Sequence, residues 1–474
     1  AVAITQTGLL KLTSLTSKDS LVLNGTDAQI GSADITDTSA ITLTGDLELA
    51  ALSSGDDASL SIGSGSAIGS LNVTGELDLN VAGVLDLDAA TSTGNTVLHH
   101  RGLAGTALRY GDLNVGGGLS VTGLGDWTGN DASVVGDATY DVGSADLHSL
   151  ISNTGKLSLD ALGLFAADVL NSKNRSVVLQ AGSAELAAVN AGTLLKANTN
   201  GNLTIATGRS VNDLTLTTTA GSLGTIRFGE LMNPSAPGVL DTAHLKSAEN
   251  LYVETDGDVF GGNAEAEYLV SIKGRNMTFG RVQSLQEDVS LIASGLHEEG
   301  NGNITGLLVE GKRDVGIIAG GNLTMPEVKF GRAYSLKAGR DLTVGIRGDL
   351  NVNVLAEAGR DLLFSIGGNV DLQGIKAGRH VDVTSGGFIN LDDRIDAGGH
   401  VKLQAKGGDV SVGQGIYSTA QYDGQAVAAN VEIDATGNVS TPEIVAAGGS
   451  IDVQAGSNLR IGTLTAKDDT DLLA

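Results

Sequence analysis

Three consecutive residues, Arg347-Gly348-Asp349, are the first candidates for chemistry in this chain. An Arg-Gly-Asp tripeptide on a protruding loop can offer a guanidinium and a carboxylate to an integrin-type receptor through charge-assisted hydrogen bonds. Against protrusion, Gly348 occupies the same repeat position as Gly368, and Asp349 the same position as Asn369. The tripeptide is therefore either a receptor-binding site or an ordinary corner before a strand, and its repeat position favours the corner.

Two histidines, His380 and His400, occupy one repeat position in successive repeats. If repeats stack as strands do, their Cα atoms lie about 5 Å apart. Two imidazoles at that spacing can hold a metal ion or respond to pH. No third ligand accompanies them, and Asn322, Asp341 and Asp361 stand at the same position elsewhere. We predict a polar turn residue here and no metal site.

Arginines recur beside this position, at Arg340, Arg360 and Arg379. In a stack they would form a basic ladder next to Asp341 and Asp361, which is a surface for an anionic polysaccharide. Exposed ion pairs contribute only about 0 to 1 kcal/mol each, and like charges in one column offset part of that. A solvated surface is the simpler interpretation, and a glycan-binding site is the alternative.

Catalysis on polysaccharides needs convergent carboxylates, or a basic residue beside calcium, in a groove with aromatic platforms. The adjacent Asp392 and Asp393 point to opposite faces of a strand and cannot act as a pair. Glu298-Glu299 has no evident partner, and one Trp, seven Tyr and seven Phe serve the whole chain. Cysteine is absent, which excludes disulfides and thiolate chemistry. We therefore expect neither an enzyme nor a cofactor.

An internal repeat supplies the elements that must position these residues. The phrase AG-x-[NDH]-[LV]-x-[VLMF] begins at five alanines spaced by 19 or 20 residues, namely Ala319, Ala338, Ala358, Ala377 and Ala397. Within each interval apolar residues alternate with polar ones, which is the period of a strand with one buried face. Three inward sets occur per interval, and the first comprises Leu342/Val344, Leu362/Phe364, Val381/Val383 and Val401/Leu403.

A repeat of about 20 residues that holds three short strands cannot close a core of its own. Stacking equivalent strands at about 4.8 Å buries the inward sets on one another and pairs the backbone N–H groups along the stack. Connections between parallel strands are right-handed as a rule. The sequence predicts an all-β fold, a right-handed parallel β-helix (β-solenoid) with about 24 coils of three short strands each.

The repeat pattern covers nearly the whole chain, so we predict one continuous β-helix over residues 1–474. Residues 1–318 carry a looser phrase with loops, 319–412 the most regular repeats, 413–427 a looped coil and 428–474 regular coils. Departures from the strand pattern are expected as a turn of helix at 159–170 and 263–269, and as loops at 96–110, 231–247 and 298–303.

The charge of the chain limits its partners. With 55 acidic and 29 basic residues the net charge is −26, so the phosphate backbone of a nucleic acid would be repelled. No uninterrupted apolar run reaches the roughly 18 residues that a membrane-spanning helix needs. We expect neither nucleic acid binding nor membrane insertion.

The repeated AGRDL-x-V and G-[ND]-[LV]-x-[VIL] phrases resemble the haemagglutinin-type repeats of filamentous-haemagglutinin-like exoproteins, the bacterial adhesins exported by two-partner secretion. The resemblance spans most of the chain, and residues 319–412 are its most specific part. It implies a β-helical shaft that is secreted or displayed on the bacterial cell surface after export by an outer-membrane transporter partner. Such shafts bind host receptors, other cells or exopolysaccharide. The Asn-Pro-Asn-type signature of the family's secretion domain is absent from this sequence, which leaves the export route open.

Repetition without a chemically exceptional coil favours a structural role. We predict an extracellular adhesin or fibre that attaches to cells, hosts or the exopolysaccharide of a biofilm matrix. A β-helical polysaccharide lyase or hydrolase and a phage-type fibre are the alternatives, whereas ice binding has only one Thr-x-Thr unit, at Thr215 and Thr217. The chain begins and ends inside the repeat pattern without an amphipathic cap, so we expect head-to-tail self-association or excision from a longer shaft.

Overall fold

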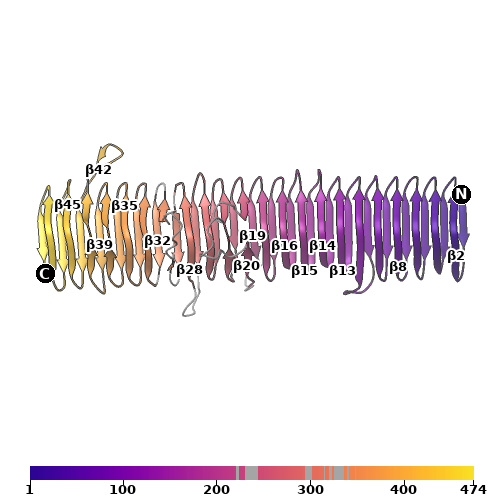
Figure 1. Ribbon diagram of the computed structural model, residues 1–474, viewed down its shortest axis with the longest axis horizontal. Coiled ribbons are helices and arrows are strands. Elements are labelled where there is room, and N and C mark those ends of the chain that lie inside the picture. The colour runs from indigo at the N-terminus through magenta and orange to yellow at the C-terminus, as the bar shows by residue number, and fades with distance from the viewer. Residues whose placement is uncertain are drawn as a thin grey trace. The chain divides into compact units, whose positions relative to one another are not determined.

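The computed structural model describes residues 1–219, 224–229, 244–293, 302–313, 315–319, 323–324, 336–338, 341–346 and 348–474. The chain is an all-β parallel β-solenoid of about 22 turns with about 19 residues per turn, and no helix occurs among those residues. It divides into two compact units, Ala1–Thr219 (unit 1) and Ala220–Ala474 (unit 2). Figure 1 shows the strands of successive coils side by side within each unit.

Unit 1 alternates short and long strands, and each pairs in parallel with its equivalent one coil further on. The short strands are β1 (Val2–Thr5), β3 (Leu21–Gly25), β5 (Ser39–Leu43), β7 (Ala58–Ile62), β9 (Leu77–Val81), β11 (Thr96–His100), β17 (Leu195–Thr199) and β19 (Leu214–Thr218). The long strands are β2 (Leu9–Ser17), β4 (Asp27–Ile35), β6 (Leu47–Ser54), β8 (Ser66–Val73), β10 (Leu85–Ser92), β12 (Ala107–Val115) and β18 (Leu203–Ser210). Both kinds are fused in β13 (Leu119–Val134), β14 (Ala138–Ser152), β15 (Leu157–Ser172) and β16 (Val177–Ala191).

Unit 2 keeps the parallel pairing but breaks its strands at more of the bends. Its first strands are β20 (Ile226–Phe228), β21 (Leu245–Ser247), β22 (Leu251–Glu254), β23 (Val259–Gly261), β24 (Ala264–Ala266), β25 (Val270–Gly274), β26 (Met277–Ser284), β27 (Val289–Ala293), β28 (Ile304–Gly311), β29 (Val315–Ala319), β30 (Leu323–Thr324) and β31 (Leu336–Ala338). Next come β32 (Leu342–Ile346), β33 (Leu350–Ala358), β34 (Leu362–Ile366), β35 (Val370–Ala377), β36 (Val381–Ser385), β37 (Ile389–Leu391), β38 (Arg394–Ala397), β39 (Val401–Ala405), β40 (Val410–Val412) and β41 (Gly415–Ser418). The last are β42 (Gln421–Tyr422), β43 (Gln425–Ala426), β44 (Val431–Ala435), β45 (Val439–Ala446), β46 (Ile451–Ala455), β47 (Leu459–Ala466) and β48 (Thr470–Leu473).

Alternation decides which residues face the core. In β6, Leu47 and Leu49 are buried whereas Glu48 and Ala50 are exposed. Two consecutive outward residues, beginning at Ala50, mark a bend, so a long strand supplies two of the three sides of a coil. Each buried leucine contributes about 1.5 to 3 kcal/mol relative to exposure. The prediction of three strand segments per coil is confirmed, and so is the burial of the first inward set, Leu342, Val344, Leu362, Phe364, Val381, Val383, Val401 and Leu403.

The expected turns of helix are wrong. Residues 159–170 lie inside β15, and residues 263–269 contain β24. The apolar run in β15 is a strand because Leu159 pairs in register with Tyr140 on one side and Leu179 on the other. Pairing with the neighbouring coils thus determines the secondary structure here, and the local sequence, which suggested a turn of helix, does not.

Insertions lengthen some coils and reduce their number from the expected 24 to about 22. Leu98 pairs with Val121, 23 residues on, because a loop at 101–106 lies between β11 and β12. The loop expected at 96–110 is therefore shorter than predicted. Leu403 pairs with Ile433, 30 residues on, because the antiparallel β42–β43 hairpin is inserted there and stands out from the coils in Figure 1. The loops expected at 231–247 and 298–303 lie mostly outside the described residues.

Polar side chains at the bends accept backbone N–H groups from the next coil. In unit 1, Asp27 Oδ1 accepts the N–H of Asp46, and Asp46 Oδ1 accepts the N–H of Gly65, both at 2.8 Å. In unit 2, Asn438 Oδ1 accepts the N–H of Asn458 at 3.1 Å. We call such a run of acceptors a corner ladder. It explains why the repeat phrase places Asn, Asp or His before each strand, since side-chain acceptors supply partners for backbone N–H groups at a bend.

Candidate functional site

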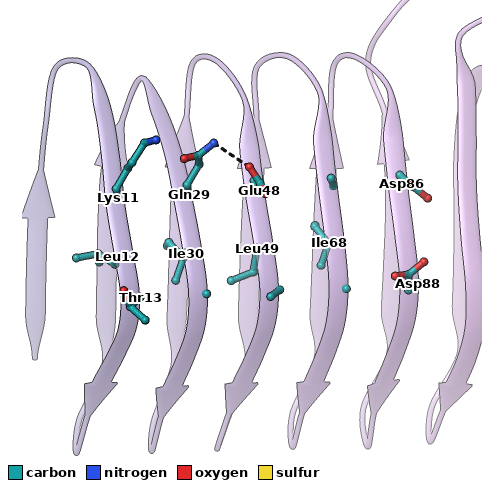
Figure 2. A pocket seen from close by; sticks show the side chains of 14 residues that line it. Lys11, Leu12, Thr13, Gln29, Ile30, Glu48, Leu49, Ile68, Asp86 and Asp88 are labelled. Carbon is teal, nitrogen blue, oxygen red and sulfur yellow. Dashed lines mark hydrogen bonds between the residues drawn. The ribbon is translucent and has the colours of Figure 1, made fainter.

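Two hollows lie on the outer surface of unit 1, across the coils of β2, β4, β6, β8 and β10. Between them runs one register row of outward residues, Lys11, Gln29, Glu48, Ala67 and Asp86. The hollow on the side of the strand starts has a volume of about 580 Å³, and the hollow on the side of the bends about 480 Å³. Figure 2 shows the second hollow, in which the labelled residues of the row follow one another across adjacent strands. We call the two hollows and the row between them the groove.

The coil of β8 has smaller side chains than its neighbours at three successive positions, and the outward one of these, Ala67, leaves the groove open there. It carries Gly65, Ser66 and Ala67, whereas the coils on either side carry Asp46 and Val84, Leu47 and Leu85, and Glu48 and Asp86. A gap one coil wide therefore separates the Glu48 and Asp86 side chains. We call this gap, with Ala67 at its base, the notch.

Partners on the outer sides orient the two carboxylates that flank the notch. Gln29 Nε2 donates to Glu48 Oε2 at 2.8 Å from the preceding coil. Arg109, in the coil after Asp86, places Nε 2.9 Å from Asp86 Oδ1 and Nη2 2.7 Å from Asp88 Oδ1. These side chains are exposed, so each contact is weak in energy, and the contacts draw Glu48 toward the coil before it and Asp86 toward the coil after it.

Ser66, the residue before Ala67, faces the core and takes the register position of Leu47 and Leu85 in the coils on either side. Its side chain is 7% exposed, and its Oγ has no hydrogen-bond partner among the described residues. Buried serines at other bends are paired, as Ser152 Oγ is with the carbonyl of Gly136 at 2.7 Å. A buried hydroxyl without a partner costs about 1 to 3 kcal/mol. The core beneath β8 thus contains an unpaired hydroxyl, on the opposite face of the strand from Ala67.

The groove can offer hydrogen bonds along the coil axis. A linear ligand laid across the strands meets one outward residue per coil, at intervals of about 4.8 Å. No aromatic side chain lines either hollow, so stacking on a ring is not the means of binding here. The sequence analysis missed these residues. The available signal was the run of small residues from Gly63 to Gly69, in which Ile68 is the one large side chain.

Two of the predicted binding residues, Arg340 and Arg347, lie outside the described residues. Gly348 and Asp349 lie at the bend before β33. Asp349 Oδ1 accepts the N–H of Asn369 at 2.6 Å, and Asn369 Oδ1 accepts the N–H of Phe388 at 3.1 Å. Asp349 is therefore part of a corner ladder, which gives its carboxylate a structural contact at the position where a receptor-binding carboxylate would have to be free.

Arg360 and Arg379 are both paired with aspartates of the same corner. Arg360 Nε donates to Asp341 Oδ1 at 2.7 Å, and Arg379 Nε donates to Asp361 Oδ1 at 2.8 Å, each with a second contact through Nη2. Burial acts to raise the pKa of Asp361, but the hydrogen bonds from Arg379 and from the His380 N–H outweigh it and leave this pKa below its usual value. The arginines thus alternate with carboxylates, and their charges are locally balanced.

His380 and His400 lie in the same corner ladder. The N–H of His400 donates to His380 Nδ1 at 3.0 Å, and the two rings are 6.5 Å apart between centroids. Nδ1 must be unprotonated to accept this bond. Burial lowers the pKa of His380, and the nearby Asp361 opposes that shift. Across the described part of the chain, no three His, Asp or Glu side chains converge as a metal site.

The sequence matches no protein-family model, and no curated protein is significantly similar to it. Within the described ranges, no helix has the length and apolar character needed to span a membrane.

Proposed function

We propose that the protein is an extracellular structural adhesin or fibre whose coils hold a polysaccharide or a cell surface. A parallel β-solenoid suits a structural role because each coil is stabilised by its neighbours and the outward residues recur at a constant spacing. The observation that carries the binding role is the groove, which presents polar side chains across five adjacent coils on a rigid backbone. A scaffold that does not move when it binds loses little conformational entropy.

The resemblance of the repeats to filamentous-haemagglutinin-like exoproteins supports the finer part of the proposal. On that basis the chain is secreted or displayed on a bacterial surface, and an outer-membrane transporter exports it. A chain without cysteine has no disulfides to hold its bends, and the corner ladders hold several of them with hydrogen bonds instead. Expression with and without a cognate transporter, followed by protease treatment of intact cells, tests the location.

A binding survey tests the adhesin role. The full chain is applied to an array of bacterial polysaccharides and to intact bacterial and host cells. We expect saturable binding to at least one polysaccharide or cell type, and the absence of binding to all of them would contradict the proposal. A salt titration measures how much of the binding is electrostatic, since salt screens the charges of a protein whose net charge is −26.

A polysaccharide hydrolase is the second candidate because Glu48 and Asp86 lie two coils apart in one outward row, with only Ala67 between them. Inverting glycosidases place two carboxyl groups roughly 6.5 to 9.5 Å apart on either side of the scissile bond. Prolonged incubation with polysaccharides that bind the chain, followed by measurement of reducing ends, distinguishes the two functions. Release of reducing ends by the native chain, but not by Glu48→Gln, would favour the hydrolase.

A further inference from the structure

We propose that an apolar ridge on unit 1 binds a basic amphipathic helix of another protein. The ridge lies at the bend that joins the short-strand side of each coil to the long-strand side. Its members are between 39 and 84% exposed, and they are Val84, Leu103, Leu124, Leu162 and Leu164. We call these five residues the ridge. The inference goes beyond the proposed function, because it assigns a protein partner to a corner of unit 1.

The ridge is continuous because its residues lie at one bend in neighbouring coils. The N–H of Asp126 donates to the carbonyl of Thr106 at 2.9 Å, and an added Cβ atom at Gly143 would overlap the carbonyl oxygen of Leu124. Four of five successive coils carry an exposed apolar residue at this bend, and Gly143 stands in the remaining one. Four intervals of about 4.8 Å give the ridge a length of about 19 Å. At its start, Val84 also lines the larger hollow of the groove.

Extra residues at the bend place the leucines in solvent. Both β13 and β15 contain one residue more at this bend than the strand that follows them, and the loop 101–106 lengthens the coil of β12. Leu124 follows Gly123, and Leu162 precedes Gly163. Gly123 has a φ of +121°, in the region that favours glycine. The backbone thus holds large apolar side chains away from the core, where burial would stabilise them, and a partner can bury them instead.

The same bend carries small or polar residues in the coils before and after the ridge. Asp27, Asp46 and Gly65 stand there before it, and Ser183 and Asn202 after it. A single exposed apolar residue is ordinary on a protein surface, whereas a contiguous set of them is typical of an interaction site. The restriction of the apolar residues to neighbouring coils therefore favours a binding surface.

Carboxylates border the ridge on both sides. Asp141 and Asp160 occupy the last outward position before the bend, and Asp126 and Asp146 lie after it. All four side chains are exposed, and none forms an ion pair with a described residue. An anionic polysaccharide or lipid would be repelled here. A partner with lysine or arginine on both sides of an apolar face complements the ridge and its borders.

The two arginines closest to the ridge in sequence make their contacts with earlier coils. Arg101 Nη2 donates to Ser61 Oγ at 3.1 Å, and Arg109 contacts Asp86 and Asp88. Their charges are therefore directed away from the carboxylates that border the leucines of β13 and β15. The negative charge at those borders is left for the basic side chains of a partner.

The backbone at the corner favours a helical partner. Successive coils pair with one another, so the backbone N–H and C=O groups beside the ridge are directed along the stack. A partner on the ridge receives no backbone hydrogen bonds from it and must satisfy its own, as an α-helix does. About 13 residues of helix match a length of about 19 Å. An apolar stripe at i, i+3, i+4 and i+7 would cover the leucines, with basic residues on both sides of it.

Fluorescence anisotropy on the full chain at low ionic strength tests the proposal. The labelled probe is a peptide of leucine and lysine of about 18 residues, with the leucines on one helical face. We expect saturable binding. Leu124→Ser combined with Leu162→Ser should weaken it by at least about tenfold, because two apolar contacts are lost. Val211→Ser is the control, since Val211 is similarly exposed at another corner of unit 1, and it should leave the affinity within about twofold.

A second pair of variants tests the charges. Asp141→Asn combined with Asp160→Asn should weaken binding by about fivefold and reduce its dependence on salt. Asp34→Asn combined with Asp168→Asn removes the same charge away from the ridge and should leave the affinity within about twofold. All of these side chains are exposed, so the far-UV spectrum and thermal transition of each variant should match those of the native chain.

Four outcomes would overturn the proposal. The first is the absence of binding by the native chain, and the second is native-like binding by the leucine variant. The third is equal affinity for a peptide of the same composition with its leucines scattered around the helix, or for a leucine-glutamate peptide of the same pattern. The fourth is self-association of the native chain that the leucine variant abolishes, which would assign the ridge to a second copy of this chain.

Discussion

The corner ladders of the two units perform one task with different side chains. In unit 1, the carboxylate of Asp46 accepts the N–H of Gly65. In unit 2, the imidazole of His380 accepts the N–H of His400 in the equivalent way. The bend therefore requires a side-chain acceptor that can reach the backbone N–H of the next coil, and either a carboxylate or an imidazole can serve. The two kinds of acceptor differ in their response to pH, because only imidazole titrates between about pH 5 and 8.

The largest expected effect should be the same in both units. Gly55 in unit 1 and Gly386 in unit 2 lie at bends where an added Cβ atom would overlap the carbonyl oxygen of the preceding coil. Replacing either by alanine should cost about 3 kcal/mol, since backbone cannot move aside as a side chain can. Gly345→Ala is the control, because its Cβ would meet no atom within 4 Å. Chemical denaturation combined with hydrogen exchange of the adjacent coils measures the cost. A tolerated substitution at one bend alone would break the equivalence of the units.

Removing the imidazole acceptor should have an intermediate effect. His380→Ala leaves the N–H of His400 without its side-chain partner, at a cost of about 1 kcal/mol. His380→Asn should retain most of the stability, because asparagine serves as the acceptor at Asn438 in the same unit. The hydrogen-exchange protection factor of the His400 amide reports the difference. Equal protection in both variants would mean that the imidazole contributes packing and not the hydrogen bond.

Mild acid should distinguish the units without any mutation. The folded pKa of His380 lies below the ordinary value of 6.5, so the unfolded chain binds a proton first as the pH falls. The stability that the neutral imidazole provides is thus present above about pH 6.5 and is lost as the pH falls through the folded pKa. We expect the protection factor of the His400 amide to fall over this range while that of the Gly65 amide does not. His380→Asn should remove the difference, and a parallel fall at both amides would contradict it.

The smallest effect should come from the ion pairs. Arg379→Ala removes the guanidinium that bonds Asp361 and should cost about 0.5 kcal/mol, because the pair is about one third exposed. The pKa of Asp361 should rise at the same time, since burial is then less opposed. Arg109→Ala in unit 1 should cost less still, because Arg109 and Asp86 are about half exposed. Carbon-detected titration of the aspartates and denaturant unfolding measure the two quantities. A larger cost for the Arg109 variant would reverse the ranking.

The periodic part of this structure could be predicted from the sequence because the same pattern of apolar and polar residues recurs in each repeat. The alternation at Leu362 and Phe364, or at Val401 and Leu403, indicates strands, and the return of the phrase after 19 or 20 residues indicates stacking. The polar turn position was also recognised, including His380. Its hydrogen bond to the next coil was not, because that contact joins residues 20 positions apart.

The groove could not be predicted because it depends on what one coil lacks. Ala67 looks like an ordinary small residue until the register places it between Glu48 and Asp86. A residue's neighbours in this fold come from coils on either side, and insertions shift their spacing. The same dependence explains the error at 159–170, where pairing with both adjacent coils determines a strand.

Every corner contact described above has its acceptor in the earlier coil and its donor in the later one, as from Asp27 to Asp46 to Gly65 and from His380 to His400. The stack is therefore polar. A chain that emerges N-terminus first finds each acceptor already fixed when the next amide arrives, so no finished coil has to reopen. A substitution that removes an acceptor should therefore lower the stability of the coil that follows it, whose amide loses its partner, and not that of the coil in which the acceptor lies.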